Sequence, residues 1–228
     1  MIWSVRRPWL VAAFVVVMVV AALSVTLGVR AQSADVDRCQ RFASDSVSRA
    51  SMVRGAGQHV VVIGDSWSAG LGLDRPGRSW PSHLAGRVHV AGFSGSGFSE
   101  HASDCAGVAF AARAPQALLH GADLVVVEGG LNDFDQPSED VRAGFAQLMS
   151  ELNGYRVVVV GPATAPSRAR AIPRVDTLLA GLAAQYDVPY VATSGLRLSY
   201  LPDRLHLTRA GHAEFGKYVA EQLTTLGS

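Results

Sequence analysis

Short runs of β-branched residues recur along this chain, and they constrain its fold more than any other feature. Each run is mostly apolar and lacks polar alternation, which is typical of strands buried on both faces of a sheet. The runs cover residues 59–63, 88–91, 124–127, 157–160 and 188–191. Alanine- and leucine-rich segments of helical character lie between or after them, at residues 106–120, 138–152, 174–186 and 208–226.

This alternation predicts an α/β fold: a three-layer α/β/α sandwich around a central parallel sheet of about five strands. Right-handed crossovers bring the carboxyl ends of such strands to one edge, where these folds bind ligands. Polar and glycine-rich segments follow three of the runs, at residues 64–66, 92–97 and 129–133. We therefore expect a functional site at that edge.

Composition excludes one class of partner. A hydrophobic fraction of 49% in 228 residues is enough for one well-buried domain with an extra segment. Twenty basic and nineteen acidic residues nearly balance, and no long basic run is present that tracks phosphates. We therefore expect no nucleic-acid partner.

The N-terminus is expected to direct export. Arg6 and Arg7 precede an apolar stretch at residues 9–29. The hydrophobic region of a cleaved signal is about 7–15 residues long and a membrane span needs about 20, so the length favours a retained signal-anchor over residues 1–31. A small-x-small cleavage site at residues 29–31 is the alternative, weakened by its central arginine. The positive-inside rule then places the rest of the chain outside the cytoplasm.

Residues 32–57 are polar and small and are expected to form a linker with a short helix around residues 36–53, before a main domain at residues 58–228. Cys39 and Cys105, the two cysteines of the chain, both lie beyond the predicted anchor, where an oxidising compartment permits a disulfide. We predict that they pair and close a loop of roughly 65 residues, worth about 3–4 kcal/mol. Two unrelated buried thiols are the alternative.

Three side chains have the chemistry of nucleophilic catalysis. Ser66 follows the first predicted strand, and Asp203 and His206 lie together near the C-terminus. A serine hydroxyl is a weak nucleophile unless an imidazole takes its proton and a carboxylate orients that imidazole. The alternatives are a helix cap at Ser66 and a surface histidine at position 206, before a cap at Thr208.

Four segments resemble, in chain order, the blocks of the SGNH or GDSL-like hydrolase family. The resemblance covers about residues 58–226 and implies the flavodoxin-like fold of these enzymes. Trp67 departs from the family pattern, where leucine is frequent. The segments are Gly64-Asp65-Ser66, Ser94-Gly95, Gly130-Leu131-Asn132-Asp133 and Asp203-Arg204-Leu205-His206.

The resemblance implies roles for the catalytic side chains: Ser66 as nucleophile, His206 as general base and then acid, and Asp203 as the residue that orients His206. At positions i and i+3 of one turn, Asp203 and His206 can lie on one face.

The resemblance also implies an oxyanion hole. Its donors would be the backbone N–H groups of Ser66 and Gly95 and the side-chain amide of Asn132. Gly92 and Gly97 are the alternatives to Gly95, and Gly95 and Asn132 could instead be only a turn glycine and a helix cap.

Other polar residues are expected to be structural or of no catalytic use. Asp65 and Asp133 are expected to bond local backbone. His101, Asp104 and Cys105 lie close in sequence, but their spacing fits no common zinc pattern. The glycines of residues 92–97 do not continue into a dinucleotide-binding motif. We therefore expect no metal and no organic cofactor.

Together these features predict an extracytoplasmic serine esterase that hydrolyses carboxylic esters, with short acyl groups, through an acyl-enzyme. Its substrate would be a small molecule or an envelope ester, and the N-terminal helix would contact the membrane. The alternatives are an acyltransferase or deacetylase acting on envelope glycans or lipids, and a non-catalytic envelope-binding protein. The oligomeric state stays open.

Overall fold

The computed structural model describes residues 8–227, and in its first helix it describes side chains only at residues 14, 16–20, 24 and from 34 onward. The chain divides into two compact units, Met1–Gln40 and Arg41–Ser228. Helix α1 (Pro8–Ala50) is continuous, so the helix expected around residues 36–53 is the last part of a longer one.

The predicted signal-anchor, residues 1–31, falls largely outside the described residues and side chains, and Arg6 and Arg7 lie outside them entirely. Within the described part of the chain, no helix combines the length and apolar character needed to cross a membrane.

The second unit is built on the predicted five-stranded sheet. All neighbouring strands are parallel, and their order is β2-β1-β3-β4-β5. The β-branched runs account for this arrangement, because in the three central strands their side chains are buried on both faces of the sheet. The strands are β1 (His59–Gly64), β2 (Arg87–Gly92), β3 (Leu124–Glu128), β4 (Val157–Val160) and β5 (Tyr190–Val191).

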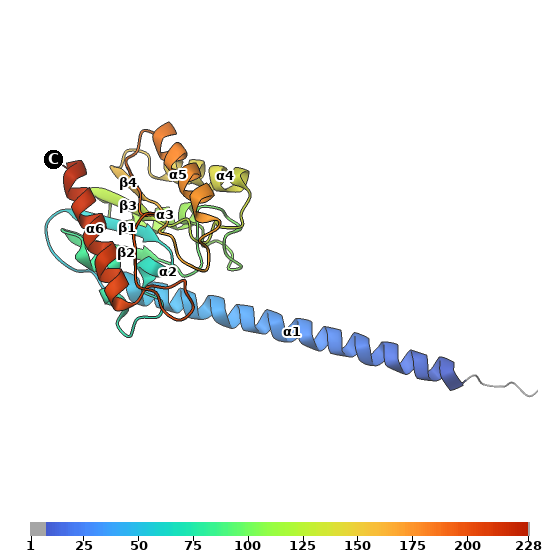
Figure 1. Cartoon of the computed structure of the whole chain (residues 1–228). Helices are drawn as coiled ribbons and strands as arrows, with labels where there is room; N and C mark the ends of the chain where they lie inside the picture. Colours follow the sequence, from blue (N-terminus) through green and yellow to red (C-terminus); the bar gives the residue numbers. More distant parts are fainter. Residues whose placement is uncertain (1–7, 228) are drawn as a thin grey trace, which may run out of the picture. The chain divides into compact units, whose positions relative to one another are not determined.

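Helices cover both faces of this sheet (Figure 1). One face packs against α3 (Phe110–Ala117), α4 (Ser138–Glu151) and α5 (Ile172–Gln185). The other face packs against α6 (Arg209–Gly227) and the 3-10 helix η2 (Trp80–His83). The three-layer α/β/α sandwich predicted from the sequence is therefore confirmed.

The register of the sheet aligns the ends of three strands. Gly64, the last residue of β1, pairs with Gly92 at the end of β2 and with Glu128 at the end of β3. The segments that follow these strands therefore begin at the same edge of the sheet, as the sequence predicts.

The cysteine prediction is also confirmed. Cys39 and Cys105 are both disulfide-bonded, and the described residues include no free cysteine.

Candidate active site

Ser66 occupies the first position of the short helix α2 (Ser66–Ala69), directly after β1. The Asp65 side chain caps this helix by accepting a 2.8 Å hydrogen bond from the Trp67 N–H. Gly64 is required for the tight approach of strand and helix, because a Cβ there would lie 2.1 Å from Ser68 Oγ. Ser66 is thus held, buried, at the carboxyl end of a central strand.

Asp203 and His206 form one compact turn. His206 Nδ1 lies 2.6 Å from Asp203 Oδ2, while Asp203 Oδ1 accepts the backbone N–H groups of Leu205 and His206, each at 3.0 Å. Arg204 between them adopts a left-handed backbone with φ +59°. The predicted contact between the acid and the imidazole is present.

The charge of Asp203 suits it to orient the imidazole. Burial opposes its ionisation, but the hydrogen bonds from His206 and Leu205 outweigh burial and hold the pKa of Asp203 below its usual value. An ionised carboxylate 2.6 Å from Nδ1 favours a proton on that nitrogen. The other ring nitrogen, Nε2, is then free to accept a proton.

A tryptophan brings the two catalytic segments together. Trp67, next to Ser66, donates its indole N–H to the carbonyl of Leu205, next to His206, at 3.1 Å. Its ring packs edge-on against Phe215, with centroids 5.3 Å apart. In the described part of the chain, no hydrogen bond joins Ser66 Oγ to the His206 ring. Catalytic hydrogen bonds are often long in unliganded enzymes and tighten when substrate binds.

Glycine is required at three positions of the loop after β2, for different structural reasons. A Cβ at Gly92 would lie 2.5 Å from the Ala69 nitrogen, and one at Gly97 would lie 2.6 Å from Asp133 Oδ2, so close packing requires both. Gly95 has open space around it, and its φ of +85° explains the glycine instead. This conformation leaves the Gly95 N–H without an internal acceptor among the described residues.

Asn132 connects the loop after β3 to this glycine loop. Its Nδ2 donates to the Ser96 carbonyl at 2.9 Å and lies 3.4 Å from Asp65 Oδ2. The amide therefore sits between the residue after Gly95 and the residue before Ser66. The contacts of Asn132 thus link the three segments that carry the predicted oxyanion donors, which follow β1, β2 and β3.

Two buried carboxyl groups next to the site differ in their partners. Asp133 accepts the backbone N–H groups of Phe98 at 3.1 Å and Ser99 at 2.8 Å, as expected of an acid that fixes a loop. Burial raises its pKa to about 6, against these hydrogen bonds. Asp65 bonds local backbone as expected, and burial likewise raises its pKa to about 6.

A third buried acid, Glu128, is the last residue of β3 and was not singled out from the sequence. Its Oε2 accepts hydrogen bonds from Ser68 Oγ at 2.6 Å and Trp80 Nε1 at 3.3 Å. Burial, reinforced by the negative charge of Asp65, raises its pKa well above the usual value. The carboxyl end of β3 is thereby joined to helix α2.

Two arginines that support the site were also missed. Arg113 donates to the carbonyls of Gly64 and Ala91, at the ends of β1 and β2, and to Ser96 Oγ in the glycine loop. Arg168 donates to Asn132 Oδ1 at 3.2 Å and lies 4.0 Å from the ring centroid of Phe134. Neither has a sequence signal, because each acts through backbone or amide groups distant in the chain.

Among the described residues, no group of three or more histidine, cysteine, aspartate or glutamate side chains is arranged to hold a metal ion. His101, Asp104 and Cys105, which lie close in sequence, form no such group, and Cys105 is disulfide-bonded.

Comparisons with known proteins give a family match for this chain. The model of the family described as GDSL-like Lipase/Acylhydrolase matches residues 62–214, more than half of the chain. No curated protein matches significantly.

Solved structures with similar folds include a carbohydrate acetylesterase from Sinorhizobium meliloti, with TM-score 0.65 and 18% identity over 75% of this chain and 100% of that one. An aryl esterase from M. smegmatis has TM-score 0.62 and 19% identity over 75% of this chain and 100% of its own. A putative arylesterase from Agrobacterium tumefaciens has TM-score 0.60 and 23% identity over 74% and 99%. At these identities the structures establish a shared fold. The family match over most of the domain goes further: the chain belongs to the GDSL-like lipase/acylhydrolase family, which makes it an ester-hydrolysing serine hydrolase.

Proposed function

We propose that this chain is a serine esterase that cleaves carboxylic esters with short acyl groups outside the cytoplasm, using Ser66, His206 and Asp203. The observation that carries the proposal is the 2.6 Å contact between His206 Nδ1 and Asp203 Oδ2, on the segment that Trp67 ties to the Ser66 helix. No metal or organic cofactor is needed for this chemistry.

In the acylation step Ser66 Oγ attacks the ester carbonyl carbon while His206 Nε2 accepts the hydroxyl proton. Asp203 stays ionised, holds the imidazole through Nδ1 and stabilises the positive charge that develops on the ring. Collapse of the tetrahedral intermediate breaks the bond to the alcohol oxygen, and His206 returns its proton to that leaving group. The product is an acyl group on Ser66.

The oxyanion of that intermediate would bind to the N–H groups of Ser66 and Gly95 and to the amide of Asn132. The two backbone N–H groups have no internal acceptor among the described residues, so they are available to a ligand. Loss of one oxyanion donor typically costs about 10²–10³ in rate. Water, activated by His206, then attacks the acyl-enzyme and releases the acid.

Two observations support the substrate class. Similar folds are found in an aryl esterase and in a carbohydrate acetylesterase, and the latter is named for a short acyl group. The segments after β1, β2 and β3 are occupied by the site itself, and the sequence has little room for a lid over a long acyl chain.

The location outside the cytoplasm rests on separate features. The N-terminal segment has basic residues before an apolar stretch, and both cysteines are disulfide-bonded, a state that persists in oxidising compartments. Protease added to intact spheroplasts should digest the domain. Protection until the membrane is permeabilised would place it inside and contradict this location.

The catalytic proposal is tested with the purified full chain on p-nitrophenyl acetate and butyrate. We expect turnover that Ser66→Ala reduces to the background rate, whereas Ser150→Ala, at an exposed serine of α4, retains full activity. Asn132→Ala should reduce kcat by about 10²–10³. Equal rates in the wild type and Ser66→Ala would refute the nucleophile.

Product analysis with a sugar acceptor present separates hydrolysis from acyl transfer. A hydrolase releases the free acid even when the acceptor is abundant. Predominant acylation of the sugar would identify a transferase on the same residues and contradict the proposed esterase function.

A further inference from the structure

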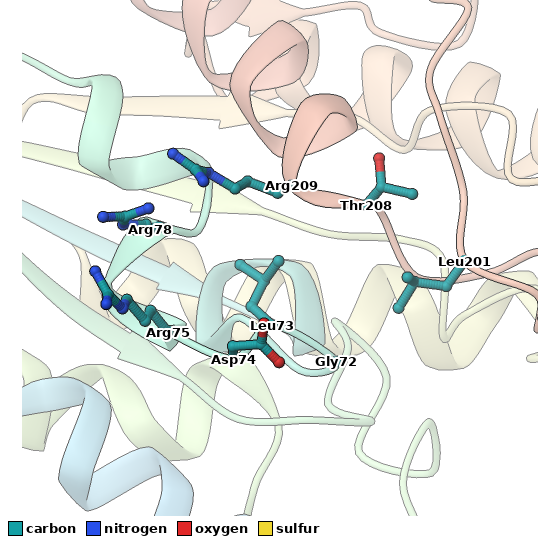
Figure 2. Close-up of a pocket in the computed structure, with 8 residues that line it drawn as sticks. All are labelled: Gly72, Leu73, Asp74, Arg75, Arg78, Leu201, Thr208 and Arg209. Atoms are coloured by element: carbon teal, nitrogen blue, oxygen red, sulfur yellow. The ribbon is translucent and has the colours of Figure 1, made fainter.

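A cavity of about 560 Å³ is lined by residues that flank the proposed catalytic segments in the chain. This volume falls within the range of about 300–1,000 Å³ that is usual for small-molecule sites. Figure 2 shows the residues that line it, which come from the segment after α2 and from both sides of the His206 turn: Gly72, Leu73, Asp74, Arg75, Arg78, Leu201, Thr208 and Arg209.

The cavity adjoins the catalytic segments through direct contacts. Leu71, next to Gly72, donates its N–H to the Ser66 carbonyl at 3.0 Å. Leu201 donates its N–H to the His206 carbonyl at 2.7 Å. Thr208 follows His206 by two residues, so their Cα atoms lie within about 7.6 Å of each other. The lining segments are therefore direct neighbours of the two segments that carry Ser66 and His206.

The walls of the cavity carry a strong positive charge. In Figure 2 the guanidinium groups of Arg75, Arg78 and Arg209 lie on one side, and the carboxylate of Asp74 points away from them. None of these arginines forms a salt bridge with a carboxylate of the described residues. The charges of Arg209 and Arg75 lower the pKa of Arg78, with a smaller contribution from Arg54.

Such a concentration of charge is unusual in this chain, whose formal net charge is only +1. Like charges held together repel one another, and the one acidic residue of the lining, Asp74, forms no salt bridge with these arginines. Guanidinium groups bind phosphate and carboxylate oxygens in pairs of hydrogen bonds, and an anion bound among them would relieve the repulsion. The first turn of α6, which begins at Arg209, adds a favourable helix dipole.

We propose that this cavity binds an anionic group, a phosphate or carboxylate, carried by the ester substrate, so that the enzyme prefers negatively charged esters. The inference rests on the proposed esterase function. Leu201 and Thr208, which flank the His206 turn in the chain, lie on one side of the cavity, and the guanidinium groups of the arginines lie on the other (Figure 2). The scissile ester and the anionic group would occupy these two sides.

The kinetic test compares matched neutral and charged esters on the purified full chain. In the first pair, mono-4-nitrophenyl glutarate carries its charge on the acyl side and 4-nitrophenyl pentanoate is the neutral match. In the second pair, 4-acetoxyphenyl phosphate carries its charge on the alcohol side and p-tolyl acetate is the neutral match. We expect at least a tenfold higher kcat/KM for the charged member of one pair, which also identifies the side of the ester that carries the anion.

The double variant Arg78→Gln/Arg209→Gln should lose most of this preference and change kcat/KM for the neutral ester less than twofold. Arg142→Gln, which removes an equal charge from exposed α4, is the control and should keep the full preference. Thermal unfolding verifies that the variants fold. An equal kcat/KM for charged and neutral esters in both pairs, or an unchanged preference in the double variant, would overturn the proposal.

A binding measurement separates this inference from the proposed function. Titration calorimetry of 4-hydroxyphenyl phosphate with Ser66→Ala should detect binding that the two arginine substitutions abolish, independently of turnover. If Ser66→Ala still hydrolyses neutral esters at the wild-type rate, the catalytic proposal fails while this measurement still stands. If inorganic phosphate binds as tightly as the phenyl phosphate and no kinetic preference exists, the occupant is a free anion and the substrate proposal is wrong.

Discussion

Asn132 is positioned by its neighbours on both sides of its amide. Its Nδ2 faces the Ser96 carbonyl, while its Oδ1 accepts from Arg168. The guanidinium is fixed in turn by the Leu131 carbonyl and the Phe134 ring. Because Arg168 can only donate, it prevents the amide from rotating by half a turn and presenting its oxygen to the oxyanion.

Arg168→Gln should therefore lower kcat without weakening substrate binding. We expect a loss of about 10- to 100-fold, less than the cost of losing an oxyanion donor outright, with KM nearly unchanged. Steady-state kinetics on p-nitrophenyl acetate measure kcat and KM separately. Arg170→Gln, at an exposed arginine two residues away, is the control. A rise in KM with constant kcat would show that Arg168 binds substrate instead of positioning Asn132.

The sequence identified Asn132 but gave no indication of Arg168. Asn132 follows a predicted strand and lies within a recognisable block, so its location could be inferred from the order of strands. Arg168 lies in a loop 36 residues further along, and its contact depends on how that loop folds back over the sheet edge. The same reason explains why Arg113 was missed.

At the scale of elements, helix α4 approaches the glycine loop very closely at Gly144. A Cβ there would lie 1.9 Å from the Phe98 carbonyl oxygen, a backbone atom of the loop that Asp133 fixes. By contrast, a Cβ at Gly181, on the exposed surface of α5, would meet no atom within 4 Å. The two helical glycines thus have different reasons to be present.

Alanine at these positions should have opposite effects on the free energy of unfolding. Gly144→Ala must displace α4 or the loop, so we expect a destabilisation of about 1–3 kcal/mol and reduced activity. Gly181→Ala should stabilise by about 0.5–1 kcal/mol, because alanine favours the helix. Urea unfolding and p-nitrophenyl acetate turnover provide both measurements. If Gly144→Ala and Gly181→Ala changed the free energy of unfolding equally, the close approach of α4 to the loop at Gly144 would be contradicted.

The boundaries of some elements were predictable and others were not. β4 matches its valine run fully, because nothing in the run interrupts the strand. β5 is shorter than its predicted run, since Pro189 has no N–H to donate and the strand begins after it. α3 begins later than predicted, at Phe110, because Gly107 has a left-handed backbone with φ +69° that no α-helix accommodates.

At the scale of the whole molecule, the buried acids predict how stability depends on pH. Burial raises the pKa of Asp65 from 3.8 to about 6 and that of Glu128 well above 4.5. The folded protein therefore binds these protons more tightly than the unfolded chain. Their stabilising contribution is complete below the unfolded values and is lost as the pH rises through the folded ones.

Glu128→Gln should flatten this dependence. Its amide can donate to Ser68 Oγ, and Trp80 Nε1 already lies 3.0 Å from the same oxygen, so the uncharged group fits. Urea unfolding between about pH 5 and 8 should show a smaller loss of free energy than in the wild type. Glu128→Ala leaves the Ser68 hydroxyl without this partner and should destabilise by about 2–4 kcal/mol. If the free energy of unfolding of Glu128→Gln depended on pH as strongly as that of the wild type, Glu128 would not be a source of this pH dependence.

The disulfide gives a second prediction at this scale. Replacing Cys39 and Cys105 with serine releases a loop of roughly 65 residues in the unfolded chain and should lower the free energy of unfolding by about 3–4 kcal/mol. Urea unfolding of the double variant measures the loss. In the denatured, unreduced wild type a thiol reagent should find no free cysteine, and two reactive thiols would contradict the bond.

The distribution of the site along the chain has a practical consequence. Ser66, Gly95 and Asn132 all precede the turn at Gly154, which has φ +84° and open space around it, and the Asp203–His206 segment follows it. A cut at this turn gives two fragments, neither of which carries a complete catalytic set. Ester hydrolysis by the mixture would then depend on pairing of β3 in one fragment with β4 in the other. The two fragments would therefore work as a split reporter, in which the p-nitrophenolate released from a p-nitrophenyl ester measures how much of the sheet has reassembled.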